Sequence, residues 1–321
     1  MNVRAQASAG TASHLPSPHH RLFGRVSTPT LRNSLHGMVF ISPWLVGLLV
    51  FVIYPIIASA FFSFTEYSVV KPPVWVGLGN YRYLFQEDKL FFTSLINTLY
   101  YAIFFIPLST IVSVGLALIL NMKVKGMAFY RTVFYLPSIV PAIASSMLWL
   151  WILNPQYGLA NEILRVVGLK PLGWLSDPHW SKPSLILMAL WGSGGGIVIF
   201  LAGLQDIPQH LYEAAELDGA GALSRLFHIT IPMITPSIFF NLVMDLIGAF
   251  QVFTSAYVMT GGGPLDSTLF YALLLFRNAF NYFKMGRASA MAWILFLIVF
   301  VLTYVLYRSS DRWVYYGGAE R

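Results

Sequence analysis

The stretch Glu213-Ala214-Ala215-Glu216-Leu217-Asp218-Gly219 is followed after nine residues by Ile229-Thr230-Ile231-Pro232, and it lies between two apolar runs. It is too polar to sit in lipid. Pro208 precedes it, and the fixed φ of proline suits the first turn of a helix. Gly219 is expected to end that helix, because the left-handed conformation that often terminates helices is open to glycine without a steric penalty. The pattern therefore predicts a short helix presented to water between two membrane spans.

One side of this predicted helix carries small side chains. Leu211, Ala214 and Ala215 recur at helical spacing, so two methyl groups would let another surface approach closely. Glu216 and Asp218 fall in the last turn, where a negative charge opposes the helix dipole by about 0.3–1 kcal/mol each. The sequence thus predicts a docking face, and it invites a basic group from outside the helix to offset the two acids.

The composition is that of an integral membrane protein. Charged residues make up 10% and hydrophobic residues 57% of the 321 residues, whereas soluble domains contain about 25% charged residues. The net charge of +7 reflects a shortage of acids, and basic groups at membrane edges explain it better than nucleic-acid binding does. Because the chain has no cysteine, disulfides, thiolate nucleophiles and cysteine-bound metals are excluded.

Six apolar runs are long enough to cross a bilayer, which takes about 20 helical residues. The first, at 37–64, is uncharged over 28 residues and is therefore too long for the apolar region of a cleavable signal peptide. The other five lie at 95–121, 132–153, 184–205, 236–259 and 288–307. The predicted fold class is an all-α integral membrane protein with six transmembrane helices.

The flanking segments predict the domain organisation and the orientation. Residues 1–36 contain four arginines and no acid and are rich in Ser, Pro and His, so a disordered cytoplasmic tail is expected there. The membrane domain is expected at 37–307, with the polar loop at 206–235, and a second cytoplasmic tail at 308–321. Six spans place both termini on one side. The short turn with Lys123, Lys125 and Arg131 favours the cytoplasm for that side.

The polar loop resembles the EAA loop of permeases from bacterial ATP-binding cassette (ABC) importers. That pattern is Glu-Ala-Ala, three residues, Gly, nine residues and Ile-x-Leu-Pro, and six of its seven fixed positions are identical here, with Ile231 in place of Leu. The resemblance extends over most of residues 37–316 and is closest to the first of the two permeases in carbohydrate importers. Further matching stretches are Gly79-Asn80-Tyr81, Ser94 with Asn97 and Thr98, Leu201-Ala202-Gly203-Leu204-Gln205, Thr260-Gly261-Gly262-Gly263-Pro264 and Trp313-Val314-Tyr315-Tyr316.

The resemblance implies a type I ABC importer permease fold, with a permease domain at 37–307, in a bacterial inner membrane. It assigns ATPase coupling to Glu213, Ala214, Ala215, Asp218, Gly219, Ile229 and Pro232. The implied partners are a second permease in a heterodimer, two cytoplasmic ABC ATPase subunits, an extracytoplasmic substrate-binding protein and membrane lipid. ATP binding would close the ATPases and turn the pathway from inward-open to outward-open. The chain itself would have no catalytic activity and no cofactor.

Four residues of the fifth span are candidates for the substrate pathway. Asp245 lies nine residues after Pro236, about 14 Å along the helix and near mid-membrane. A carboxylate at this depth is expected to face the bundle interior or a wet cavity, where it either accepts hydrogen bonds from substrate or serves in packing. Phe250, Gln251 and Thr254 add a ring, an amide and a hydroxyl, which is the mixture that a sugar needs, although helix packing explains each of them as well. The resemblance places part of the sugar pathway in this helix.

Other stretches carry weaker signals. The glycines at 192–196 lack the Gly-Lys-Ser/Thr of a phosphate loop, so close helix packing or a local unwinding is expected there. The stretch 261–264 predicts a turn. Aromatic residues in the outer connections, such as Trp75 and Trp174, predict an interfacial belt or contacts with the binding protein. Arg287 stands where the family usually has an aromatic residue, and Lys284 adds a charge nearby.

The predicted function is import of an oligosaccharide or related polyol. The chain has no Walker A pattern, so ATP hydrolysis is expected on another subunit, and no His-Glu-x-x-His or other metal site is found. Glycerol phosphate or another anionic polyol stays an alternative because of Arg277, Lys284 and Arg287. An ion-coupled secondary carrier would usually show several intramembrane ionisable groups, and a membrane enzyme would need paired reactive groups.

Overall fold

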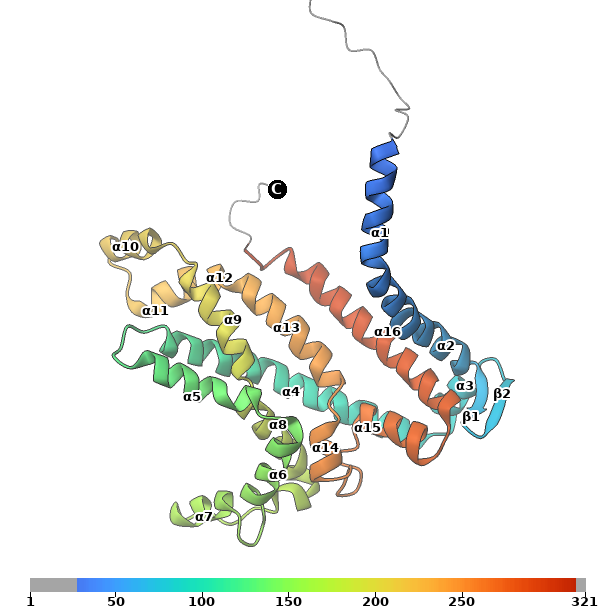
Figure 1. The fold of residues 1–321 in the computed structure, drawn as a ribbon. Helices are drawn as coiled ribbons and strands as arrows, with labels where there is room; N and C mark the ends of the chain where they lie inside the picture. Colours follow the sequence, from blue (N-terminus) through green and yellow to red (C-terminus); the bar gives the residue numbers. More distant parts are fainter. Residues whose placement is uncertain (1–27, 316–321) are drawn as a thin grey trace, which may run out of the picture. The chain divides into compact units, whose positions relative to one another are not determined.

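The computed structural model describes residues 28–315, with side chains from residue 36 onward. The described chain is mostly helical and divides into two compact units between Ile56 and Ile57. Figure 1 shows the helices and a small β-hairpin, coloured along the sequence. The ends of the two predicted tails, residues 1–27 and 316–321, lie outside the described residues.

The first unit contains α1 (Thr28–Leu48), a π-helical turn η1 (Leu49–Ile53) and the beginning of α2 (Tyr54–Ser63). Helix α1 therefore begins inside the segment that the sequence assigns to the N-terminal tail. The large apolar side chains of this unit face outward, since Phe40 is 85% and Phe51 is 79% exposed. Such a helix surface is stable in lipid, where apolar side chains need no protein partner.

The second unit starts with the end of α2 and a hairpin of β1 (Thr65–Ser68) and β2 (Lys71–Trp75), which pair antiparallel. This hairpin is an addition to the all-α expectation. The helices that follow are α3 (Gly79–Gln86), α4 (Lys89–Leu120), α5 (Met127–Ile139), α6 (Ala142–Ile152), α7 (Leu159–Val166), the 3₁₀ turn η2 (Trp174–Ser176), α8 (Pro178–Trp191), α9 (Gly194–Gln205), α10 (Gln209–Leu217), α11 (Ala222–Arg225), the π-helical turn η3 (Leu226–Thr230), α12 (Ile231–Met233), α13 (Thr235–Phe250), α14 (Thr254–Met259), α15 (Tyr271–Phe276), the π-helical turn η4 (Arg277–Asn281) and α16 (Met285–Ser310).

Four segments of the described chain are long and apolar enough to span a membrane by themselves: His36–Ser63, Lys89–Leu120, Thr235–Met259 and Met285–Ser310. They coincide with the first, second, fifth and sixth predicted spans. The remaining two predicted spans are bent pairs, and counting each pair as one span gives 6.

The bends have local causes in the sequence. Helices α5 and α6 meet at 99°, where Val140 is extended and precedes Pro141, a pairing that disfavours helical backbone. Helices α8 and α9 meet at 47° across Gly192 and Ser193. The glycine-rich stretch therefore interrupts the fourth span, as the unwinding alternative predicts.

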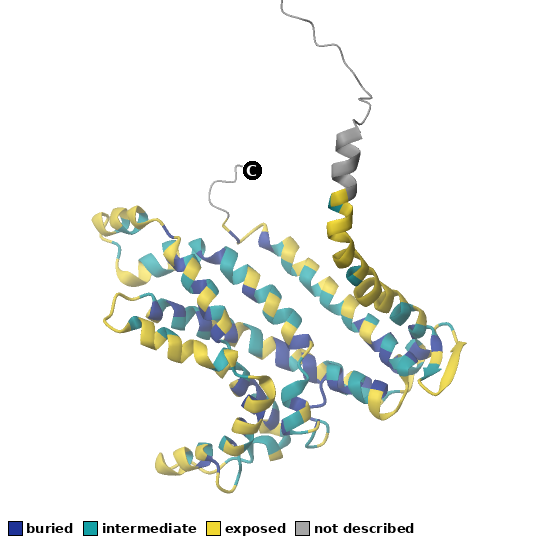
Figure 2. Cartoon of the chain, in the orientation of Figure 1, coloured by how far each residue is buried: buried dark blue, intermediate teal, exposed yellow. Residues whose placement is uncertain are grey.

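Helix α4 is the central element of the second unit, because α8, α9, α13 and α15 all pack against it. One buried cluster surrounds Phe91, Phe250 and Tyr271, and a smaller one surrounds Phe200 and Ile234. Figure 2 shows buried positions along the inner faces of α4, α9 and α13, with exposed positions on the outer faces. The core is thus concentrated where helices cross, and much of the apolar surface is left for lipid or other subunits.

The described C-terminal segment folds back onto α13. Helix α16 continues to Ser310, and Val314 is 6% exposed. The backbone N–H of Tyr315 donates a hydrogen bond of 2.9 Å to Thr235 Oγ1 at the start of α13. The last span is therefore fastened to the fifth at the end where the polar loop lies.

Candidate functional site

The polar loop contains the short helix that the sequence predicts. Helix α10 runs from Gln209 to Leu217, and Pro208 serves as its N-cap with φ −62° and ψ 127°. Proline thus stands one residue before the first turn, in an extended conformation that lets the helix begin directly after it. Figure 1 shows α10 and α11 beyond the ends of α9 and α13.

Gly219 ends this helix in the expected left-handed conformation, with φ +79°. Its N–H donates to Glu216 O at 3.0 Å, and the N–H of Ala220 donates to Ala215 O at 2.8 Å. These two bonds form a complete Schellman motif, which satisfies carbonyl groups that the end of a helix leaves free. A Cβ at Gly219 would meet no atom within 4 Å, so the backbone angle is what requires glycine here.

An ion pair supplies the basic group that the sequence invites. The Arg225 guanidinium in α11 pairs with the Glu216 carboxylate in the last turn of α10. Arg225 is about one quarter exposed and Glu216 more than half exposed, so the pair is worth at most about 1 kcal/mol. The ion pair also connects α11 to the last turn of α10.

The base of the loop is fixed to the membrane helices. Tyr212 and Thr230 join their hydroxyl groups at 2.9 Å, which connects α10 to the turn before α12. Leu211, Ile229 and Met233 pack against the smaller buried cluster. The loop is therefore anchored on the buried cluster that α4 and α9 share.

The seven residues assigned to coupling fall into two groups. Those exposed at the free end of the loop are Glu213, Ala214, Asp218 and Gly219, and those half-buried are Ala215, Ile229 and Pro232. Sequence reasoning missed two exposed apolar side chains beside the first group, Leu217 at 90% and Leu223 at 71% exposure. Both leucines stand within the polar loop 206–235, so the sequence alone could have indicated them as exposed apolar residues.

Asp245 lies on the wall of a cavity of about 250 Å³. The cavity is bounded by α4, by the break between α8 and α9, and by α13. Its polar lining residues are Ser109, Thr110, Ser113, Ser193, Asn241 and Asp245, and its aromatic ones are Phe105 and Phe200. The Ser109 hydroxyl lines the same cavity as the Asp245 carboxyl. The Asp245 carboxyl therefore lies among hydroxyl and amide groups, as expected for a carboxylate at this depth.

The glycine-rich break shapes this cavity. A Cβ at Gly194 would lie 2.8 Å from Phe134 O, so α9 could not pack as closely on α5 with any other residue. A Cβ at Gly196 would lie 3.1 Å from Asn241 Oδ1. Gly192 and Gly195 line the cavity itself. Both readings of the stretch, close packing and interruption of the helix, therefore apply.

Phe250, Gln251 and Thr254 do not form one helical face. Helix α13 ends at Phe250, and α14 begins at Thr254, so the assumed continuous helix is broken between them. Phe250 is 2% exposed and belongs to the main core, while Gln251 is exposed and Thr254 is half-buried. None of the three lines the cavity that contains Asp245. Their pathway role stays a prediction, and for Phe250 the structure shows packing.

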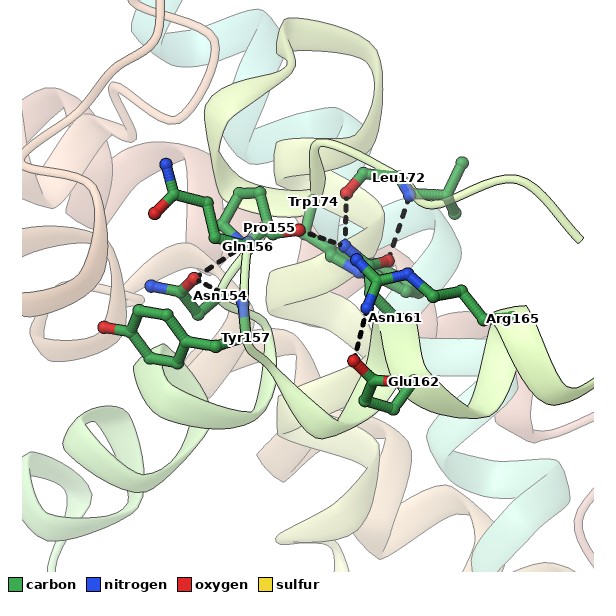
Figure 3. A network of polar contacts seen from close by, with 9 residues as sticks. All are labelled: Asn154, Pro155, Gln156, Tyr157, Asn161, Glu162, Arg165, Leu172 and Trp174. Atoms are coloured by element: carbon green, nitrogen blue, oxygen red, sulfur yellow. Dashed lines mark hydrogen bonds and ion pairs between the residues drawn. The ribbon is translucent and has the colours of Figure 1, made fainter.

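The connection between α6 and α8 is held by specific hydrogen bonds. Asn161 of α7 is 1% exposed, and its Nδ2 donates to Pro155 O at 2.9 Å and Leu172 O at 3.0 Å. Its Oδ1 accepts from Leu172 N at 3.0 Å and from Trp174 Nε1 at 2.8 Å. Figure 3 shows how this single amide joins the turn before α7 to the chain that follows it. Trp174 is therefore held by a specific bond as well as by packing.

Asp177 caps the next helix. Its side chain accepts a 2.8 Å hydrogen bond from the backbone N–H of His179 at the start of α8. This bond to the charged form holds the pKa of the Asp177 carboxyl below its ordinary value. Asp177 thus fixes the residue at which α8, the first helix of the fourth span, begins.

Comparison of the sequence with known proteins identifies the family of this chain. Residues 109–315 match the family described as the inner membrane component of binding-protein-dependent transport systems. The probable ABC transporter permease protein YesP of Bacillus subtilis is 44% identical over 293 residues, covering 90% of this chain and 94% of its own. The trehalose/maltose transport system permease protein MalF of Thermococcus litoralis is 34% identical over 279 residues, covering 85% and 93%.

The fold is also found in a solved structure. A chain of the bacterial alginate ABC transporter, crystallised in complex with an alginate pentasaccharide-bound periplasmic protein, aligns with a TM-score of 0.79 at 23% identity, covering 90% of this chain and 98% of that one. The chain belongs to the inner membrane components of binding-protein-dependent transport systems, has the type I ABC importer permease fold, and is a transport subunit rather than an enzyme.

Proposed function

We propose that this chain is the permease subunit through which a sugar, an oligosaccharide or a related polyol, crosses a bacterial inner membrane, driven by ATPase subunits that dock on the loop 206–235. One observation carries the proposal: α9 and α13 line the cavity with Asp245 and also lead into the two ends of the loop. A movement of the loop as a body would therefore displace two walls of the cavity.

The cavity suits a polyhydroxylated solute. Its hydroxyl, amide and carboxylate groups can exchange hydrogen bonds with sugar hydroxyls, and Phe105 and Phe200 offer rings for the CH faces. The similarity to a trehalose/maltose permease supports the same class of substrate. Asp245 is an acid, and none of the described residues that line the cavity is basic. An anionic polyol would therefore meet repulsion there.

The three cations that favour an anionic substrate lie elsewhere. Arg277 donates a hydrogen bond to Gly261 O and so anchors the turn after α14. Lys284 and Arg287 lie at the beginning of α16. None of them lines the cavity with Asp245, and the anionic alternative loses its main argument.

In the coupling loop, Glu213 is assigned polar contact with the ATPase, and Ala214 and Ala215 allow close approach. Gly219 with Asp218 shapes the helix end, while Ile229 and Pro232 seat the loop on the membrane helices. Similarity to ABC permeases supports two ATPase subunits, a second permease and an external binding protein as partners. Docking on the ATPase places this loop, and with it both termini, in the cytoplasm.

A pull-down in mild detergent tests the proposal. The full-length subunit is isolated with its neighbours as wild type, as Glu213→Ala with Gly219→Val, and with Gly221→Val as a control in the same loop. Gly221 has φ −70°, which valine adopts without left-handed strain, and a Cβ there meets no atom within 4 Å. Recovery of an ATPase and a second permease with the wild type and the control alone is the expected result. Absence of both partners from the wild-type sample would refute the coupling role.

A further inference from the structure

A second cavity, of about 270 Å³, lies in the second unit between the β-hairpin, α3 and the beginning of α16. Its charged and phenolic side chains are Glu66, Tyr67, Tyr83, Glu87, Lys284 and Arg287. It is separate from the cavity with Asp245, with which it shares no lining residue. Figure 1 shows the hairpin and α3 at the opposite end of α16 from the C-terminal segment that contacts α13.

The walls of this cavity are held by close backbone contacts. Asn80 Nδ2 donates to Ser63 O at 2.9 Å and to Thr65 O at 2.8 Å, which ties α3 to the start of the hairpin. A Cβ at Gly286 would lie 2.0 Å from Thr65 O, so α16 touches β1 where only glycine fits. The charged side chains therefore project from a defined frame.

The cavity combines both signs of charge without internal neutralisation. Glu66 and Glu87 carry the negative groups, and Lys284 and Arg287 the positive ones. Within the described chain none of these four side chains forms an ion pair. The Arg287 guanidinium lies over the Tyr83 ring, 3.6 Å from its centroid, which leaves its N–H groups available at the ring edge. A ligand with one negative and one positive group would find a partner for each.

The surroundings place this cavity at the boundary of the membrane. The first span ends at Ser63, the second begins at Lys89 and the last begins at Met285, and the cavity lies among these three ends. Several aromatic residues close in sequence to the lining residues are exposed: Phe61, Trp75, Phe85, Tyr282 and Phe283. Aromatic residues of this kind mark the headgroup level of a bilayer.

We propose that this cavity binds the headgroup of a zwitterionic phospholipid that carries a phosphate and a primary ammonium, as phosphatidylethanolamine does. The phosphate contacts Lys284 and Arg287, and the ammonium donates hydrogen bonds to Glu66 and Glu87. Charge-assisted hydrogen bonds are the strong ones, and at the rim of a bilayer they form in partly dehydrated surroundings. The acyl chains lie along the exposed apolar faces of the adjoining spans.

The test uses the full-length subunit, stripped of lipid in detergent and then supplied with phosphatidylethanolamine, phosphatidylglycerol or phosphatidylcholine in mixed micelles. Bound lipid is counted by native mass spectrometry, and the thermal midpoint is followed in parallel. Phosphatidylethanolamine is expected to bind about tenfold more tightly than phosphatidylglycerol, which lacks the ammonium and so loses two charge-assisted bonds. Equal binding of the two lipids would overturn the proposal.

Paired variants separate the two ends of the headgroup. Glu66→Gln with Glu87→Gln is expected to abolish the preference for phosphatidylethanolamine, while Lys284→Gln with Arg287→Gln lowers binding of every phospholipid. Arg287→Lys keeps the positive charge, so it should retain the phosphate contact that Arg287→Gln removes. Controls of matched charge are Lys71→Gln, exposed on the same hairpin, and Glu162→Gln, exposed on α7, because neither lines the cavity. The same loss in the control variants would contradict the assignment.

A soluble competitor distinguishes the source of the zwitterion. If the ligand is a lipid, O-phosphoethanolamine at the same concentration leaves the bound phosphatidylethanolamine in place, since it lacks the acyl chains. If the free compound displaces the lipid, the cavity is a solute site and the lipid proposal fails.

Discussion

At the scale of single residues, the structure singles out the backbone angle of Gly219 in the loop 206–235 and the charge of Asp245 in the cavity. Gly219 meets no neighbour that would exclude a side chain, yet its φ of +79° is one that other residues reach only with strain. Asp245 carries a charge in a cavity whose other lining groups include hydroxyls, an amide and aromatic rings. The two residues can therefore be tested by substitutions that change one property each.

Replacing Gly219 by alanine should reduce coupling. Left-handed backbone disfavours alanine by roughly 1–2 kcal/mol, so the last turn of α10 would rearrange and displace the exposed acids. Substrate-stimulated ATP hydrolysis in proteoliposomes that contain the assembled transporter measures the effect. Gly221→Ala is the matched control, because φ is −70° there and the site is equally open. Equal losses in both variants would show that the backbone angle of Gly219 is not the cause.

Replacing Asp245 by asparagine keeps the shape of the side chain and removes its charge. If a neutral sugar passes the cavity, uptake by the reconstituted transporter should fall, because a carboxylate accepts stronger hydrogen bonds from hydroxyl groups than an amide does. An anionic solute would instead be transported faster, since the repulsion disappears. Glu162→Gln makes the same chemical change on the exposed face of α7. Unchanged uptake and substrate preference would remove Asp245 from the pathway.

At the scale of elements, the breaks in the helices matter more than their lengths. The interruption at 192–193 turns α9 by 47° relative to α8 and brings its first residue against α5. Helix α9 then runs from the cavity to the coupling loop. The contact between α5 and α9 therefore lies on the helix that leads into the loop 206–235.

Two adjacent glycines test that contact. A Cβ at Gly194 would lie 2.8 Å from the backbone oxygen of Phe134, whereas a Cβ at Gly195 would meet nothing within 4 Å. Gly194→Ala should thus destabilise the subunit by about 1–3 kcal/mol, and Gly195→Ala should leave its stability equal or slightly higher, since alanine favours helix. Thermal unfolding of the purified full-length subunit in detergent compares them. A lower midpoint for Gly195→Ala than for Gly194→Ala would contradict the packing argument.

At the scale of the whole molecule, the two ends of the spans have different characters. One end carries the coupling loop and the described C-terminal segment, which Thr235 and Tyr315 join. The other carries the hairpin, α3, α7 and the turn at 261–264. This polarity is what a transport subunit needs when an ATPase acts on one side of the membrane and a binding protein on the other.

The chain has no cysteine, so its orientation can be measured with single introduced thiols. Ser224→Cys in the coupling loop and Arg312→Cys after α16 should react with a membrane-impermeant maleimide only after the inner membrane has been permeabilised. Ser176→Cys between α7 and α8 should react in intact cells. All three positions are exposed in the structure. Labelling of Ser224→Cys and Ser176→Cys from the same side would disprove six crossings.

The sequence by itself determined the spans, the position of the polar loop 206–235 and the need for glycine at 219. Each of these follows from local properties: the length of an apolar run, the polarity of a short stretch, or the backbone preference of one residue. The hairpin at 65–75, the bend of 99° before Pro141 and the end of α13 at Phe250 were not predicted, because periodicity locates a span without showing where its helix is interrupted.

Only the tertiary structure decided which polar groups meet. Ser109 and Ser113 of α4 line one cavity with Asn241 and Asp245 of α13. The Asn161 side chain binds the turn before α7 and the chain that follows this helix. Glu66 and Glu87 likewise share a cavity with Lys284 and Arg287 from the other end of the chain. Contacts between distant segments depend on how the helices pack against one another, and that packing is set by the whole set of side chains at each crossing rather than by any single stretch.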